Sequence, residues 1–110
     1  MSRSLDARVT RGAHWLDLHT PDWSDEIDVD TLRMGSPRQC ILGQVYGNYF
    51  VAADQFTLTC SATIKLGFNG SLVGLLLTAE LFRLRRAWRK LILARRAAQE
   101  SADAVPLEAQ

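Results

Sequence analysis

The sequence lacks the residue patterns on which most functional predictions are based. Its 110 residues include two cysteines, too few for a disulfide framework or a cysteine-based zinc site. The N-terminal stretch MSRSLDARV has no apolar core of a signal peptide, and no segment contains the roughly 20 predominantly apolar residues of a membrane span. These absences favour a protein of the reducing cytoplasm and argue against a membrane partner.

A strong excess of positive charge, usual in dedicated nucleic-acid binders, is also missing, because the formal net charge is only +1. The charges are nevertheless unevenly placed. From Asp17 to Asp30 there are six acidic residues and no Lys or Arg, whereas from Arg83 to Arg96 there are seven basic residues and no acidic one. We expect the acidic segment to face the basic one, within one chain or across a dimer, because opposite charges attract over about a Debye length.

No catalytic or cofactor-binding pattern is present. His14 and His19 are five residues apart, which places them about 140° apart around a helix and not on one face, as a zinc-binding pair requires. The segment EIDVDT (26–31) lacks the glycine and the terminal glutamate of a calcium loop. There is no nucleophile elbow, and the glycines form no phosphate-binding loop. We therefore expect no enzymatic activity, no metal and no cofactor.

Apolar residues at three- and four-residue steps predict a mainly α fold, a single small domain of about four helices over residues 1–98. The first helix is expected over residues 5–19. Pro21 ends it and begins a short second helix that extends to about Ile27. Residues 99–110 (QESADAVPLEAQ) are expected to form a disordered tail.

The third helix is expected from Pro37 to about Asp54. The residues SPRQ (36–39) form a capping box with proline at the first helical position. Gly43 and Gly47 lie one turn apart in this helix. They leave a strip where another part of the backbone can pack closely within the domain.

For residues 56–66 (FTLTCSATIKL) the sequence allows two conformations, a strand or a short helix. The strict alternation of apolar and polar residues predicts a strand, in agreement with three threonines. No other segment alternates in this way, so a strand would leave backbone groups unpaired unless it paired across a dimer. We favour the alternative, a short helix that ends at Gly67.

The longest periodic segment, residues 71–98, predicts a long basic amphipathic helix at the C-terminal end, with Ser71 as its cap. Its apolar seam, with steps of four, three, four and three, consists of Leu77, Leu81, Leu84, Trp88 and Leu91. The basic residues lie off this seam, which directs them to solvent. Such a helix is about 40 Å long and spans or exceeds the body of a compact domain of this size.

The first half of the chain contains three distinctive blocks, RGAHWLDLHTPDW (11–23), IDVDTL (27–32) and QCILGQVYGNYF (39–50). Together they resemble a set of short, largely uncharacterised proteins from actinobacteria and their phages. Those proteins share an RGA–LD start, a Pro-x-Trp, an Ile-Asp-x-Asp-Thr-Leu and a Cys-x-Leu-Gly-Gln followed by a Gly-x-Tyr. The resemblance implies a mainly helical, intracellular protein encoded by a phage or prophage, and it implies no activity. Some of those proteins have a second cysteine shortly before the position of Cys40, and its absence here argues against a shared metal site.

Two functions agree with these features. We favour a non-enzymatic role in protein–protein interaction through the long C-terminal helix, with a host protein, a phage protein or a second copy as the partner, in the cytoplasm of the host cell. The alternative is a regulatory protein that binds nucleic acid through the basic face of residues 83–96. The residues expected to contact the partner are Arg85, Arg86, Trp88, Arg89 and Lys90.

Overall fold

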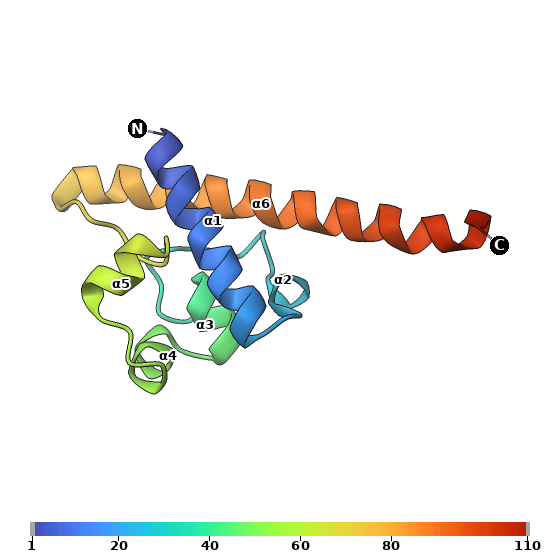
Figure 1. Cartoon of the computed structure of the whole chain (residues 1–110). Helices are drawn as coiled ribbons and strands as arrows, with labels where there is room; N and C mark the ends of the chain where they lie inside the picture. Colours follow the sequence, from blue (N-terminus) through green and yellow to red (C-terminus); the bar gives the residue numbers. More distant parts are fainter. Residues whose placement is uncertain (1, 110) are drawn as a thin grey trace.

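The computed structural model describes the backbone of residues 2–109 and the side chains of residues 5–101, and all regular structure in this part of the chain is helical. Two long helices, α1 (Ser2–His19) and α6 (Gly74–Ala109), cross each other, and the short helices lie below α6 in Figure 1. The short helices are α2 (Trp23–Glu26), α3 (Ile41–Tyr46), α4 (Tyr49–Gln55) and α5 (Cys60–Lys65). The mainly α fold is confirmed, with six helices in the described chain instead of about four.

The first two predicted helices are confirmed with shifted bounds. α1 begins at Ser2 and ends at His19, two residues before Pro21. α2 begins only at Trp23, because residues 20–22 form a turn in which the Trp23 N–H donates to the Thr20 carbonyl at 2.9 Å. Trp23 and the residue that ends α2, Ile27, are both buried, so the two apolar residues of this short segment face the core.

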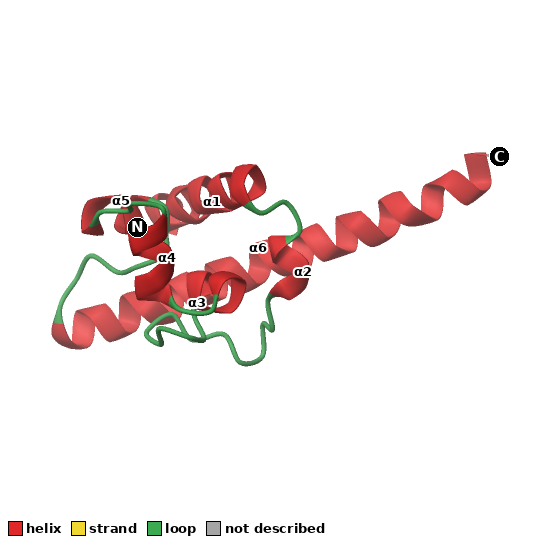
Figure 2. Ribbon diagram, turned by 90° about the horizontal axis from the view of Figure 1, so that it is seen from below, coloured by secondary structure: helices red, strands yellow, loops and turns green. Residues whose placement is uncertain are grey.

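α6 is longer than the body on which it packs. The molecule measures 55 × 30 × 22 Å, and the C-terminal part of α6 extends away from the other helices along the longest dimension (Figures 1 and 2). α6 continues past residue 98, where the sequence predicted the helix to end, so it is longer than the predicted helix. The disordered tail predicted over 99–110 lies mostly outside the described side chains and stays a prediction.

The core lies between α1 and α6 and is closed from below by the short helices. Leu84 and Trp88 of α6 are fully buried, which confirms the centre of the predicted seam. The Trp88 ring stacks on Phe68 and meets Trp23 edge to face, each with a centroid distance of 5.7 Å. From α1 the core receives Leu5, Val9, Ala13 and Leu16. Three aromatic rings thus fix the place where α6 crosses the body.

The single helix predicted from Pro37 to Asp54 is wrong, because the chain turns in the middle of it. Gly47 has a φ of 94°, a left-handed conformation that glycine adopts at low cost, and it ends α3. Asn48 then begins α4, since its side-chain oxygen accepts the N–H groups of Phe50 and Val51. Gly47, which was predicted to leave room for close backbone packing, ends a helix instead.

The predicted capping box forms a turn ahead of α3 and does not begin the helix. The Ser36 hydroxyl accepts the Gln39 N–H at 3.2 Å, and the Cys40 sulfur, not Ser36, caps α3 by accepting the Gly43 N–H at 3.3 Å. A Cβ on Gly43 would lie 2.3 Å from the Pro37 carbonyl oxygen. The close backbone packing predicted at Gly43 is therefore confirmed. The backbone that packs against Gly43 is that of the turn at residues 36–39.

The helical alternative for residues 56–66 is confirmed, and the strand is wrong. Residues 56–59 connect α4 to α5, and the Thr59 hydroxyl caps α5 by accepting the Ala62 N–H at 3.1 Å. Gly67, with a φ of 73°, follows the end of the helix. A helix satisfies its backbone groups locally, whereas a strand at this place would have no neighbour to pair with.

Gly12 is the point where α1 comes closest to the loop after α5. A Cβ at this position would lie 1.9 Å from the Leu66 carbonyl oxygen and 2.9 Å from Trp88 Cζ2. We predict that Gly12→Ala lowers the free energy of unfolding by about 3 kcal/mol, because neither a backbone carbonyl nor a buried indole can move aside. The measurement is the urea midpoint of unfolding.

The control for this prediction is Gly35→Ala. The nearest atom to a Cβ at Gly35 is Leu81 Cδ1 at 3.5 Å, an ordinary contact. Its unfolding free energy should change by less than about 0.5 kcal/mol. Equal midpoints for the two variants would contradict the close approach at Gly12.

Candidate functional site

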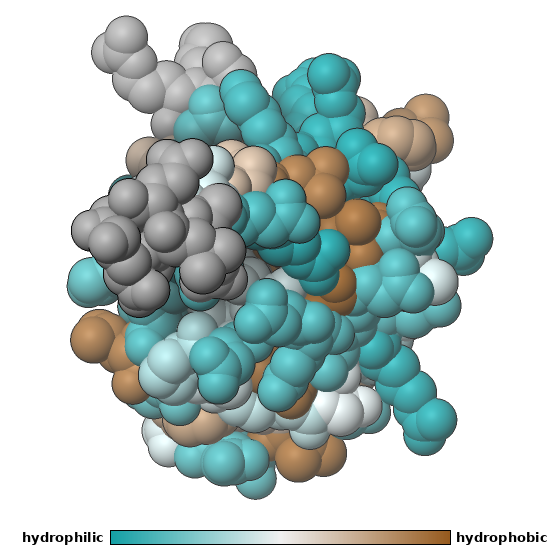
Figure 3. All heavy atoms as spheres, turned by 90° about the vertical axis from the view of Figure 1, so that its right-hand side faces the viewer, coloured by the Kyte–Doolittle hydropathy of each residue, from teal (hydrophilic) through white to brown (hydrophobic). Residues whose placement is uncertain are grey.

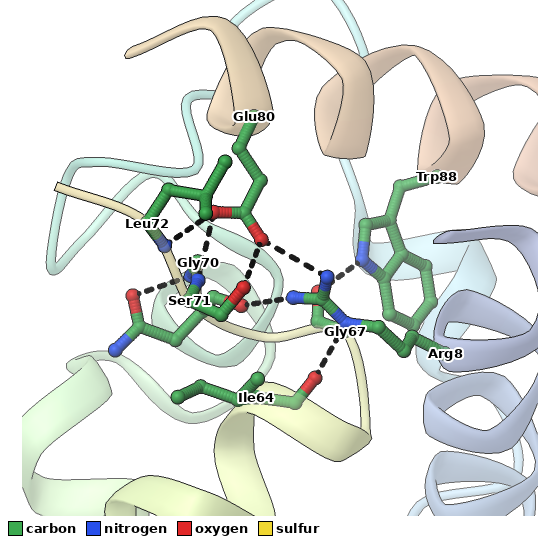
Figure 4. Close-up of polar contacts among 9 residues, drawn as sticks. Arg8, Ile64, Gly67, Gly70, Ser71, Leu72, Glu80 and Trp88 are labelled. Atoms are coloured by element: carbon green, nitrogen blue, oxygen red, sulfur yellow. Dashed lines mark hydrogen bonds and ion pairs between the residues drawn. The ribbon is translucent and has the colours of Figure 1, made fainter. Parts of the chain in front are cut away.

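Arg8 of α1 and Glu80 of α6 form an ion pair inside the protein. Arg8 Nη1 lies 3.0 Å from Glu80 Oε2, and Glu80 is only 3% exposed. The guanidinium also donates to the carbonyls of Ile64 at 2.8 Å and Asn69 at 2.7 Å. Figure 4 shows Arg8 reaching from α1 between the end of α5 and the start of α6. This one side chain joins three segments that are distant in the sequence.

The Glu80 carboxylate holds the loop that leads into α6 (Figure 4). It accepts the Ser71 N–H at 2.7 Å, the Leu72 N–H at 2.8 Å and the Ser71 hydroxyl at 3.0 Å. Burial raises the pKa of the Glu80 carboxyl, but these donors and Arg8 outweigh burial, so its pKa lies below the usual value. Ser71 is therefore bound to Glu80 and is not the helix cap that was predicted, because α6 begins at Gly74.

Sequence reasoning missed this ion pair. Glu80 lies three residues after Leu77 and four before Leu84, which places it on the inward face of α6. A single acidic residue on an apolar helix face requires a buried donor, and this was the available signal. Nothing in the sequence around Arg8 identified it as that donor.

The five residues predicted to contact a partner do not form one surface. Trp88 is fully buried, and its indole N–H donates to the Gly67 carbonyl at 2.7 Å. Arg85 is half-buried and donates through Nε to the Leu32 carbonyl at 2.6 Å. Including these two in a contact surface is therefore wrong, since both lie on the inward side of α6. The other three are exposed: Arg86, Arg89 and Lys90.

The predicted attraction between the acidic and the basic segment is confirmed within one chain. Arg95 forms a two-pronged ion pair with Asp17, with Nη2 and Oδ2 2.9 Å apart. The hydrogen bond with Arg95 lowers the pKa of Asp17. Arg96 donates to the carbonyls of Ser24, at 2.8 Å, and Ile27. The end of the basic segment therefore binds the end of α1 and the segment around α2 within the same chain.

An open groove of about 780 Å³ lies between the start of α1 and the middle of α6, and we call it the α1–α6 groove. Its apolar lining residues are Leu5, Ala87 and Leu93, and its charged lining residues are Asp6, Arg83, Arg86, Arg89 and Lys90. Among the described residues, none of the four basic side chains takes part in an ion pair. Figure 3 looks along α6 from its C-terminal end and shows separate groups of apolar side chains among mostly hydrophilic ones.

Possible metal ligands are not brought together by the fold. Within side chains 5–101, no three His, Cys, Asp or Glu residues form a group that could hold a metal ion. Cys40 is buried and Cys60 is exposed, and both thiols are free. His19 stacks on Trp15 with a centroid distance of 4.0 Å. Over the same described part of the chain, no helix has an apolar stretch that would reach across a bilayer.

Comparisons with protein-family models, with curated proteins and with solved structures gave no match to this chain.

The Arg8–Glu80 pair predicts how stability depends on pH. Because the folded pKa of Glu80 is lower than its unfolded pKa of about 4.3, its contribution is fully present above that value and is lost as pH falls through the folded pKa. We predict that Glu80→Gln costs about 3 kcal/mol at neutral pH, since it leaves a buried guanidinium unpaired. The Glu80→Gln variant should also lose less stability than the unchanged protein as the pH falls below about 4.3, as measured by chemical denaturation.

The control is Asp17→Asn, which removes an ion pair whose side chains are 36% and 39% exposed. This change should cost only about 0.5 kcal/mol, because solvent screens such a pair. An equal loss of unfolding free energy in the two variants would show that the buried ion pair stabilises the fold no more than the exposed one.

Proposed function

We propose that the protein is a non-enzymatic interaction module that binds an acidic, amphipathic helix of a partner protein in the α1–α6 groove. The observation that carries the proposal is the combination of an apolar floor with an unpaired row of cations. Leu5 and Leu93 offer apolar contact, while Arg86 and Lys90 stand exposed beside them. A helix laid into a groove uses this combination, with apolar anchors for affinity and charges for orientation and association rate.

The spacing of the cations supports a helical partner. Arg83, Arg86 and Lys90 follow one another at steps of three and four residues, so they form a row along one face of α6. The rise between them is about 4.5 Å and 6 Å. Carboxylates at the same steps on an antiparallel partner helix have the same spacing, which allows all three pairs to form together.

Protein is favoured over nucleic acid by the groove itself. Its apolar lining residues, among them Leu5 and Leu93, suit the apolar side chains of a protein helix and not a phosphate backbone. Trp88, the aromatic residue within the basic segment, is buried and cannot stack on a base. The near-neutral net charge of +1 points the same way. In line with the resemblance described above, the proposal includes a phage- or prophage-type protein that acts in the cytoplasm of its host.

The test is a binding titration with a synthetic acidic peptide that carries glutamates at helical steps of three and four and leucines between them. We predict that Arg86→Glu with Arg89→Glu weakens peptide binding by about 30-fold, equivalent to about 2 kcal/mol, because both reversals replace attraction by repulsion. Fluorescence anisotropy measures the binding. Circular dichroism should show an unchanged fold, since both side chains are exposed.

The matched control is Arg33→Glu with Arg38→Glu, which changes the net charge by the same amount at exposed positions outside the groove. Its peptide affinity should stay within about twofold to threefold of the unchanged protein. An equal loss of peptide affinity in both double variants would show that only the net charge matters and not the position of the cations in the groove. Tighter binding to a DNA or RNA oligonucleotide, with a steep dependence on salt, would replace the proposal by the nucleic-acid alternative.

A further inference from the structure

A second surface of α6, outside the α1–α6 groove, exposes apolar side chains that nothing in the described chain covers. Leu75 is 89% exposed, Val73 80%, and Leu76 and Phe82 64% each. We define the outer strip as Leu72, Val73, Leu75, Leu76, Ala79 and Phe82, all of them exposed. Single exposed apolar residues are common on proteins, but a group at neighbouring helical positions indicates a contact surface.

The outer strip has a regular pattern of its own. Leu75, Ala79 and Phe82 follow at steps of four and three, which places them along one line on the face opposite to Leu84 and Trp88. The line has a large residue at each end and a small one in the middle. No charged residue belongs to the strip, so an acidic partner would find nothing to pair with there.

We propose that the outer strip is the contact between two copies of this chain, in which the two α6 helices cross antiparallel at Ala79. In this arrangement Ala79 lies against Ala79 of the second copy, where the small side chain lets the helices approach. Leu75 and Leu76 lie against Phe82 of the second copy, and the same contact is repeated by symmetry. Each contact is thus made twice, with the roles of the two copies exchanged, as an isologous interface requires.

Charge selects the antiparallel direction. In a parallel pair, Arg83, Arg86 and Arg89 would each face the same residue of the other copy, and like charges at this distance repel. In the antiparallel pair, Arg86 lies seven residues beyond the crossing point. The two copies of Arg86 are then about 21 Å apart along the helix axis, and those of Arg83, four residues beyond the crossing point, are about 12 Å apart. Both separations exceed one Debye length at physiological salt.

The size of the strip fits a weak dimer. Its side chains expose on the order of 600 Å², at the upper end of the largest apolar patch on a typical monomer. Two copies would bury roughly 1,200 Å² in total, the lower limit for specific protein–protein interfaces. We expect a dissociation constant on the order of 10–100 µM, with monomer at high dilution.

Sedimentation velocity over protein concentrations from about 1 to 500 µM tests the pairing, because this range brackets the expected dissociation constant. Phe82→Glu should raise the dissociation constant at least tenfold, since it places a carboxylate against Leu75 and Leu76 of the second copy. The control is Phe50→Glu in α4, at a residue that is also exposed, at 66%, but lies outside the strip. Its dissociation constant should stay within about twofold.

Cysteine crosslinking tests the register. In a Cys60→Ser background, which removes the exposed native thiol, Ala79→Cys should form a disulfide-linked dimer under mild oxidation. Ala97→Cys is the control, because residue 97 lies five full turns along the same face. In the antiparallel pair the two copies of residue 97 are about 54 Å apart and cannot crosslink.

Two outcomes would overturn the pairing. The first is a monomer at every concentration, with vesicles of phosphatidylcholine and phosphatidylserine bound by the unchanged protein and not by Phe82→Glu. That result would assign the strip to a lipid surface. The second is crosslinking of Ala97→Cys as readily as of Ala79→Cys, which would show a parallel or unspecific association. Peptide binding in the α1–α6 groove is measured separately and does not depend on either result.

Discussion

The buried contact between Arg8 and Glu80 determines how α6 is placed on the rest of the molecule. A carboxylate in an apolar core is stable only where donors surround it, and Glu80 finds them on α1 and on the loop before its own helix. With Leu84 and Trp88 it fixes the rotation of α6 about its axis. Every residue on the opposite face, from Leu75 to Arg86, is turned to solvent as a consequence.

The basic segment of α6 consists of two groups with different physical roles. Arg85, Arg95 and Arg96 lie on the side of the body. Arg95 donates to the Asp17 carboxylate near the end of α1, and the other two donate to carbonyl oxygens of α2 and of the chain after it, up to Leu32. Arg83, Arg86, Arg89 and Lys90 point outward, and only these remain for recognition. Counting the whole run of charges as one surface therefore overstates what a partner can reach.

The sequence predicted the class of fold and the long amphipathic helix well, because both follow from the periodicity of apolar residues. It failed where one side chain decides the local geometry. Gly47 and Asn48 divide a helix that looked continuous. The alternating residues 56–66 contain the short helix α5, because no second strand exists in the described chain to pair with them. Within the candidate site, exposure of Arg86, Arg89 and Lys90 followed from their place off the seam. The groove depends on the position of α1 across α6, and the contact of Arg8 with Glu80 spans 72 residues. Such long-range contacts leave no periodic trace in the sequence.

The tripeptide of residues 11–13 lies where α1 is docked onto the end of α5. Arg11 donates to the Lys65 carbonyl, Gly12 leaves no space beside the Leu66 carbonyl, and Ala13 is completely buried. Gly12 and Ala13 are thus occupied by packing, and Arg11 is held at the surface by a backbone contact. Substitutions on the outward face of α6 can therefore change what that surface offers to a partner, whereas a substitution in this tripeptide disturbs the docking of α1 first.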